Sequence, residues 1–351
     1  MGVVHNKRIE FIDALRGFTM ILVVLVHVAG FCLNIDGTTP SIHLFVQQIR
    51  MPMFFFVSGF VMYKEFSLWT FHNIKIFLKK KARVQILGTF VFFISYLYVH
   101  AISIKDGILS ETKYGYWFTF TLFLFYIIYL IIVFLCRRCK EYYTDFIFLF
   151  SGCCIYLLAI PAIFETLPVN RNIFNIIGMP YWGLYFFFVL GTLTRKYYVK
   201  IEYYLDHKPF LFICLCIFIL FNLLSDTITS LSWNLFYFPT ALSGIVIIFS
   251  FFRIHAFIFR KEANLGKILQ FIGKRTLDIY FIHYFLLPIN VSKIVMVFHA
   301  YPMPIIEYIV SFSITIVIIA FCLLIGAILR LSPEISYWIF GVNKEYYIKL
   351  N

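Results

Sequence analysis

Residues 16–27 read RGFTMILVVLVH: an arginine, then ten residues of which only Thr19 is polar, then a histidine. His27 comes eleven positions after Arg16, so on an α-helix the two lie within about 20° of one face and roughly 16 Å apart along the axis. An arginine inside a membrane helix costs on the order of 2.5–3.5 kcal/mol and normally faces the bundle interior or a wet cavity. The stretch therefore predicts a membrane helix over 11–33 with one polar face turned inward.

The composition extends this prediction to the whole chain. Of the 351 residues, 62% are hydrophobic and only 13% are charged, which excludes an ordinary soluble protein. The eight cysteines lie in or beside apolar runs, so they do not form the disulfide framework of a small secreted domain. No polar stretch is long enough to fold separately. We therefore expect one all-α, polytopic membrane domain over 1–351, with no appended soluble domain.

A membrane crossing needs roughly 20 apolar residues per helix, and this length predicts about ten transmembrane helices. They cover 11–33, 43–63, 84–103, 116–136, 143–161, 176–194, 209–224, 233–252, 276–290 and 305–329.

The basic residues set the orientation of these helices. Of the 30 Lys and Arg, 24 fall in the N-terminal tail, the even-numbered loops and the C-terminal segment, and only 4 fall in the odd-numbered loops. Cytoplasmic loops carry the excess of positive charge, so both termini are predicted to be cytoplasmic. The net charge of +13 then indicates topology and contact with an anionic lipid bilayer, and it does not indicate nucleic-acid binding.

The second predicted helix, 43–63, runs in the opposite direction and carries Arg50 about seven residues from its outer end. His27 lies about as far from the outer end of the first helix, so the two side chains are expected at one depth. A guanidinium beside an imidazole favours the neutral ring, which is the form that a general base needs. The alternative is that Arg50 is only an ion-pair or backbone-carbonyl staple.

The same helix continues as RMPMFFFVSGF over 50–60. Pro52 removes a backbone hydrogen bond, and Ser58 with Gly59 supplies a hydroxyl and room for close helix approach. Such a helix suits the wall of a cavity, with Ser58 a substrate-binding candidate, although a packing role for Ser58 is the alternative.

The predicted helix over 276–290 adds a second group of ionisable residues. In TLDIYFIHYF, Asp278 comes near the cytoplasmic face, with Tyr280 and His283 deeper. A lone histidine in a membrane helix can simply hydrogen-bond a neighbouring helix, and this structural reading of His283 stays open beside a functional one.

Two other residues are assigned by position. Asp13 precedes Arg16 by three residues, so the two can pair on one helix face and fix the arginine. Trp117 is a candidate for contact with a carbohydrate, but the 45 Phe and 24 Tyr form a background of core-packing and lipid-facing aromatic residues from which a sugar-stacking stripe cannot be distinguished.

Five segments in order resemble the acyltransferase-3 family of polytopic membrane enzymes. FIDALRGFTMILVVLVH is similar to its first helix and RMPMFFFVSGF to its second. GYWFTFTLFLFY, YFFFVLGTLTRKY and IGKRTLDIYFIHYF resemble later segments. The family pattern matches Arg16, His27, Arg50, Phe55, Ser58, Gly59, Trp117, Phe118, Gly191, Gly273, Leu277, Tyr280 and His283.

The resemblance implies an O-acyltransferase that moves an acyl group, usually acetyl, from cytoplasmic acetyl-CoA to a hydroxyl of a cell-surface or exported carbohydrate. It implies a multi-pass protein of the inner or plasma membrane that modifies polysaccharides of the bacterial cell envelope, without a metal. Many relatives carry an appended extracytoplasmic domain, so this chain is expected to act alone or with an envelope or glycan-assembly partner.

Site roles follow from the resemblance and the spacing together. His27, Arg50 and His283 are the catalytic candidates, and Arg16, Asp13 and Tyr280 are candidates for binding the acyl donor. His27 would either deprotonate the acceptor hydroxyl or carry the acyl group itself.

Two alternative functions involve no catalysed reaction. A transporter or lipid-linked glycan flippase explains the membrane helices equally well, whereas a scaffold protein leaves the buried charges without a role.

Overall fold

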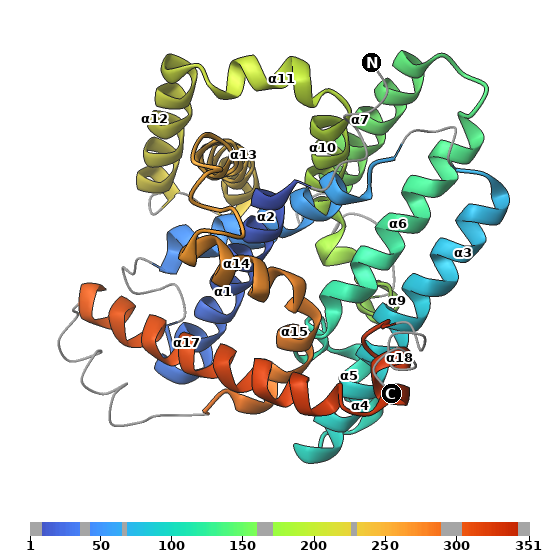
Figure 1. The fold of residues 1–351 in the computed structure, drawn as a ribbon. Coiled ribbons are helices and arrows are strands. Elements are labelled where there is room, and N and C mark those ends of the chain that lie inside the picture. The colour runs from blue at the N-terminus through green and yellow to red at the C-terminus, as the bar shows by residue number, and fades with distance from the viewer. Residues whose placement is uncertain are drawn as a thin grey trace. The chain divides into compact units, whose positions relative to one another are not determined.

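The computed structural model describes residues 9–35, 43–64, 69–159, 171–225, 230–288 and 304–342. All regular structure in these ranges is helical, as the all-α prediction required (Figure 1). The longer helices are α1 (Glu10–Leu33), α2 (His43–Met62), α3 (Phe71–Lys81), α4 (Gly88–Val99), α6 (Trp117–Leu135), α7 (Glu141–Leu158), α10 (Tyr185–Lys196), α12 (Lys208–Ser225), α13 (Ser230–Ile254), α14 (Asn264–Lys274), α15 (Thr276–Leu286) and α17 (Pro304–Leu329). The shorter ones are η2 (Ala82–Leu87), α5 (Ile104–Leu109), η3 (Lys113–Gly115), α9 (Arg171–Ile176), η4 (Met179–Leu184), α11 (Tyr198–Leu205) and α18 (Pro333–Trp338).

Six helical segments in these described ranges are long and apolar enough to cross a membrane. They are Glu10–Leu33, Phe45–Met62, Phe71–Val99, Trp117–Leu135, Tyr237–Ile254 and Pro304–Leu329. A seventh crossing results if α11 and α12, which meet at a 77° bend, are counted as one span. The chain therefore has the helices of a multi-pass membrane protein, while the count of about ten and the cytoplasmic termini stay predictions.

The segment predicted as the span 276–290 differs most from expectation. Its helix α15 has 11 residues, which cover about 16 Å of a hydrocarbon core about 30 Å thick. Arg275 separates it from α14 with a non-helical ψ of 19°. At the other end Leu287 adopts extended backbone, because the residue before a proline is disfavoured in the helical region and Pro288 follows. His283 thus sits on a short helix that begins and ends at backbone breaks.

The described part of the chain forms two compact units. One unit contains the described residues of 9–57 and 199–326, and in it α1 packs against α13, α14 and α15 while α12 packs against α13. A Cβ added at Gly17 would lie 2.0 Å from the carbonyl oxygen of Leu269, and one added at Gly273 would lie 1.9 Å from that of Asp13. The backbones of α1 and α14 are therefore in direct contact, which only glycine allows at both places.

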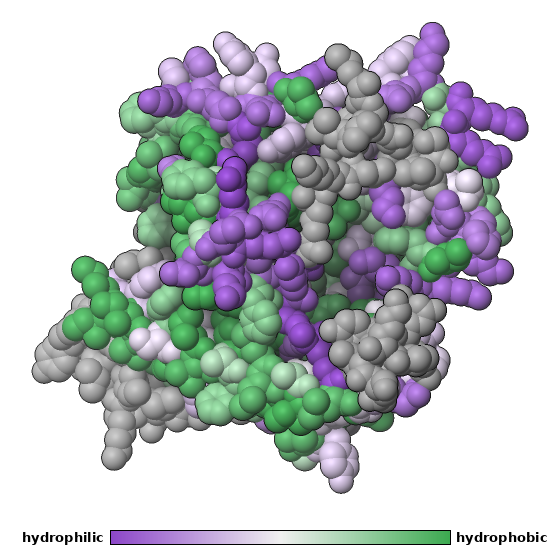
Figure 2. Space-filling model, viewed as in Figure 1, coloured by the Kyte–Doolittle hydropathy of each residue, from purple (hydrophilic) through white to green (hydrophobic). Residues whose placement is uncertain are grey.

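Helix α17 has two chemically different faces. One buries Glu307, Ser311 and Thr315, and there His43 of α2 lies 3.1 Å from the Ser311 hydroxyl, measured from its Nε2. The exposed face is apolar, and Figure 2 shows hydrophobic side chains covering this helix. It includes Ile305, Ile309, Phe312, Ile316, Val317, Phe321 and Leu324. This division is that of a helix with one side in lipid and the other in the bundle.

The other unit contains the described residues of 58–198 and residues 327–342. Its helices α6, α7 and α10 share a core of buried aromatic rings, in which Tyr129 stacks on Phe148 with centroids 5.0 Å apart and Phe125 meets Tyr185 edge-on at 5.2 Å. The segment around Gly59 also belongs here. A Cβ at Gly59 would lie 1.9 Å from the carbonyl oxygen of Phe188, so the glycine of the VSG motif allows the end of α2 to contact α10.

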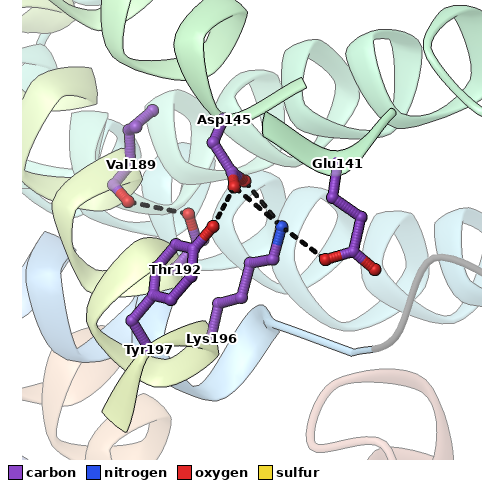
Figure 3. Close-up of polar contacts among 6 residues, drawn as sticks. All are labelled: Glu141, Asp145, Val189, Thr192, Lys196 and Tyr197. Carbon is purple, nitrogen blue, oxygen red and sulfur yellow. Dashed lines mark hydrogen bonds and ion pairs between the residues drawn. The ribbon is translucent and has the colours of Figure 1, made fainter. Parts of the chain in front are cut away.

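A group of charged residues joins α7 to α10 in this unit (Figure 3). The Lys196 ammonium lies 2.8 Å from each oxygen of Asp145 and 3.3 Å from a carboxylate oxygen of Glu141. Lys196 and Asp145 are about nine-tenths buried, whereas Glu141 is largely exposed. The Tyr197 hydroxyl donates to Asp145, and this hydrogen bond with burial raises the pKa of Tyr197 to about 12. The buried carboxylate of Asp145 on α7 is thus paired with the ammonium of Lys196 on α10.

Replacing Lys196 by methionine is expected to lower the free energy of unfolding by about 3 kcal/mol, because the Asp145 carboxylate then stays buried without its cation. Glu141→Gln is the matched control, since an exposed ion pair contributes about 0–1 kcal/mol. The measurement is thermal unfolding of the purified protein in detergent. Equal melting temperatures for Lys196→Met and wild type would show that this ion pair does not hold α7 and α10 together.

Candidate active site

Helix α1 places Arg16 and His27 on one face, and both side chains contact α15. The Arg16 Nη2 donates to the Thr276 hydroxyl at 3.3 Å, and the Nδ1 of His27 lies 3.1 Å from the Nε2 of His283. The two contacts follow the same order along both helices, because α1 and α15 pack side by side. The face predicted from the eleven-residue spacing is thus the face that α1 turns toward α15.

The hydrogen bonds of the two histidines define their tautomers. The Nδ1 of His283 lies 2.8 Å from the carbonyl oxygen of Ile279, which can only accept, so this nitrogen carries the proton. In the neutral ring the Nε2 of His283 is then the acceptor for the Nδ1–H of His27. The remaining nitrogen of His27, Nε2, carries a lone pair. A backbone carbonyl on α15 therefore fixes which atom of His27 is basic.

Tyr284 completes this cluster. Its hydroxyl lies 3.2 Å from the Nε2 of His27, and its ring centroid lies 4.0 Å from that of His283. The rings of His27 and His283 are nearly parallel, with 9° between their planes. His283 is completely buried, Tyr284 is 6% exposed and His27 is half-buried. The three rings of the cluster pack against one another and are largely shielded from solvent.

Arg50 lies on α2 two residues before Pro52, within a helix that continues through the proline. It is half-buried, and its charge interacts electrostatically with both His27 and His283. The common membrane depth expected for Arg50 and His27 stays a prediction. A cationic guanidinium at this place can stabilise a negative oxygen that forms beside the imidazoles.

The other end of α15 carries further charges. Asp278 is 1% exposed and pairs with Arg275, whose Nη1 lies 3.4 Å from its Oδ2. With Arg16 on Thr276, two guanidinium groups therefore lie at the first turn of α15. Guanidinium groups bind phosphate oxygens in bidentate fashion, so the hydrogen-bond donors at this end could hold a phosphate group.

Two of the predicted donor-binding residues lie near these groups. Asp13 is buried on α1, where its carbonyl oxygen faces Gly273, and its predicted pairing with Arg16 stays a prediction. Tyr280 is buried on α15 with its ring centroid 6.4 Å from that of His283. Tyr280 is thus a neighbour of the histidine pair, and its predicted contact with the donor stays a prediction.

Ser58 and Trp117 belong to the other compact unit. Ser58 is half-buried beside Gly59, and Trp117 begins α6 with its ring stacked on Tyr181 at a centroid distance of 3.6 Å. Their predicted substrate contacts stay predictions. Sequence reasoning did not select Tyr181 or Tyr284, although the position of Tyr284 directly after His283 was a usable signal.

No group of three or more His, Cys, Asp or Glu side chains that could hold a metal ion occurs among the described residues. A family model described as an acyltransferase domain matches residues 9–328, nearly the whole chain. Comparison with curated proteins and with solved structures gives no match. The matched range contains all the residues of the cluster around His27.

Proposed function

Since the chain belongs to the acyltransferase-3 family, we propose that it transfers an acyl group, most simply acetyl, from cytoplasmic acyl-CoA to a hydroxyl of a cell-surface or exported carbohydrate. We also propose that the protein lies in the inner or plasma membrane and that it acts with an envelope or glycan-assembly partner. The observation that carries it is the His27–His283 pair, which leaves a basic nitrogen fixed in a buried site.

His27 is the proton acceptor in this mechanism. A catalytic base is recognised by a second group that orients it, and His283 orients His27 through the Nδ1–H···Nε2 hydrogen bond. The acceptor hydroxyl would lose its proton toward the Nε2 of His27 while its oxygen attacks the thioester carbonyl. The lone pair on Nε2 could act as a base or as a nucleophile, and we propose that it acts as a general base.

Arg16 and Arg50 act on opposite ends of the donor. Arg16 would bind a phosphate near the start of α15, and about 16 Å of helix axis separates it from His27. The pantetheine arm supplies the thioester at the far end of that distance. Arg50 would stabilise the negative oxygen of the tetrahedral intermediate, because a fixed cation requires no reorganisation as the charge forms.

The direct test uses membranes that contain the protein, with membranes lacking it as the control. They are incubated with acetyl-CoA labelled in its acetyl group, and both free CoA and label in glycan and lipid-linked glycan fractions are followed. Release of CoA together with labelled glycan is the expected result. If neither signal exceeds the control with several candidate glycans present, the enzyme proposal is wrong and transport without chemistry becomes the better reading.

Arg16→Lys is expected to raise the KM for acetyl-CoA about 10-fold and to leave kcat within a factor of about 3. Lysine keeps the charge but loses the planar fork that holds phosphate with two hydrogen bonds. The exposed Arg138 provides the control substitution, Arg138→Lys, with KM unchanged.

The role of phosphate is tested with acetyl-pantetheine, which has the thioester but no nucleotide diphosphate. If Arg16 binds a phosphate, wild type and Arg16→Lys should use this donor equally well. A tenfold difference that persists with acetyl-pantetheine would show that Arg16 acts elsewhere.

A further inference from the structure

Tyr284 contacts the basic nitrogen of His27 and has no role in the mechanism above. Its hydroxyl is 3.2 Å from Nε2, and with both imidazoles neutral that nitrogen has only a lone pair to offer. The phenol must therefore be the donor, O–H to Nε2. The Nε2 of His27, which is to receive the acceptor's proton, thus already accepts a hydrogen bond from the Tyr284 hydroxyl.

The ring of Tyr284 is held on several sides. It packs against His27 at a centroid distance of 5.0 Å, against His283 at 4.0 Å and edge-on against Phe31 at 6.3 Å. It also directly follows His283 on α15. To vacate Nε2, the ring would have to leave these contacts, and its immediate chain neighbour is anchored by the hydrogen bond to Ile279. Displacement of the phenol by the substrate is thus disfavoured by the packing.

We propose that Tyr284 is a catalytic proton relay, through which the acceptor hydroxyl delivers its proton to His27. This inference rests on the proposed acyl transfer and adds a residue to it. A phenol suits the role because it is a stronger acid than an alkyl hydroxyl and can accept with its oxygen while donating its own proton. The hydroxyl of Tyr284 then also determines where the acceptor oxygen is placed.

Two protons move and one ester bond forms in the proposed step. The acceptor O–H bond breaks and its proton bonds to the Tyr284 oxygen, while the proton of Tyr284 moves to the Nε2 of His27. The acceptor oxygen forms its bond to the thioester carbonyl carbon, and the carbonyl electron pair moves onto the oxygen near Arg50. On collapse the C–S bond breaks, and the thiolate takes a proton that leaves Nε2. Ester and free thiol result, and Tyr284 and His27 return to their starting forms.

Tyr284→Phe removes only the hydroxyl and keeps the ring contacts. The expected result is a fall in kcat of about 10²-fold, the usual range of a lost proton-transfer group, with the KM for acetyl-CoA unchanged. The solvent isotope effect gives a readout that a structural role would not change. In H₂O–D₂O mixtures, kcat of wild type should show two protons in flight, and the residual rate of the variant should show one.

Tyr185→Phe is the matched control, because Tyr185 is another fully buried tyrosine, in the other compact unit. Its kcat and its proton inventory should equal those of wild type. If Tyr284→Phe fails to insert, 3-fluorotyrosine at position 284 keeps the hydroxyl and lowers its pKa. The alkaline limb of the kcat–pH profile should then move to lower pH, which a passive hydroxyl would not cause.

The outcomes separate the two proposals. If wild type is active and Tyr284→Phe has the same kcat and the same proton inventory, the relay is wrong. Acyl transfer itself is unaffected by that result. A fluorotyrosine enzyme with the wild-type pH profile would overturn the relay in the same way. If wild type releases no CoA and labels no glycan, acyl transfer itself is wrong, and the relay is rejected with it.

Discussion

His27→Ala is expected to abolish acyl transfer, with a loss of at least about 10³-fold in kcat, while the protein remains folded and inserted in the membrane. The loss is large because the substitution removes the imidazole that His283 orients, and this imidazole is the proposed base. His27→Gln should be equally inactive, since an amide can hydrogen-bond Tyr284 but cannot take a proton. The measurement is CoA release from labelled acetyl-CoA at matched expression.

The control for this prediction is His207→Gln, because His207 is exposed between α11 and α12. It should have wild-type activity. Near-normal turnover by either His27 variant would show that another group takes the proton.

A second readout distinguishes the two roles of His27. With labelled donor and no acceptor, a general base leaves the protein unlabelled, whereas an acyl carrier accumulates label that disappears in His27→Gln. We expect no label on the protein, because the unprotonated Nε2 faces the Tyr284 hydroxyl.

Gly17→Ala and Gly273→Ala are each expected to destabilise the protein by about 3 kcal/mol or more, or to prevent folding. The new Cβ would lie 2.0 Å from a carbonyl oxygen of α14 in the first case and 1.9 Å from one of α1 in the second. Backbone cannot be repacked as a side chain can, so α1 and α14 must separate. Thermal unfolding in detergent measures the loss.

The same helix offers a matched control in Gly30→Ala. Among the described residues no atom lies within 4 Å of the Cβ that this substitution would add, so the change should be neutral or should stabilise α1 by up to about 1 kcal/mol. If Gly17→Ala melts at the temperature of Gly30→Ala, the close contact of α1 and α14 is wrong. Activity should fall with stability at Gly17 and Gly273, because a displaced α1 carries His27 away from His283.

Part of the candidate site could be predicted from helical periodicity alone. The eleven-residue spacing of Arg16 and His27 placed them on one face, and the matched depth of Arg50 placed its charge near the imidazole. The shared face of Arg16 and His27 is confirmed by their contacts with α15, because positions along one helix are set by local geometry, whereas the depth of Arg50 stays a prediction. The same reasoning left His283 with a structural alternative, since no local rule says which helix lies across from it.

The length of the helix predicted over 276–290 could not be predicted from the sequence in this way. Apolar length predicts a crossing wherever about 20 hydrophobic residues follow one another, and α1, α2, α6 and α17 meet that rule. Yet the helix that contains His283 is separated from α14 at Arg275, and it ends before Leu287. Hydropathy counts side chains and does not detect a change in backbone direction, so it does not predict that the helix at this place has only 11 residues.

The sequence by itself determined the membrane class, the family, the α-helical content and the residues that carry charge into the lipid, because each of these is a property of composition or of short-range spacing. Only the tertiary structure decided that His283 contacts His27, that the Ile279 carbonyl selects the basic nitrogen, and that Tyr284 occupies it. The reason is that a hydrogen bond between residues some 256 positions apart depends on how α1 packs against α14 and α15. That packing is set by contacts between backbones, which no periodicity in either helix encodes.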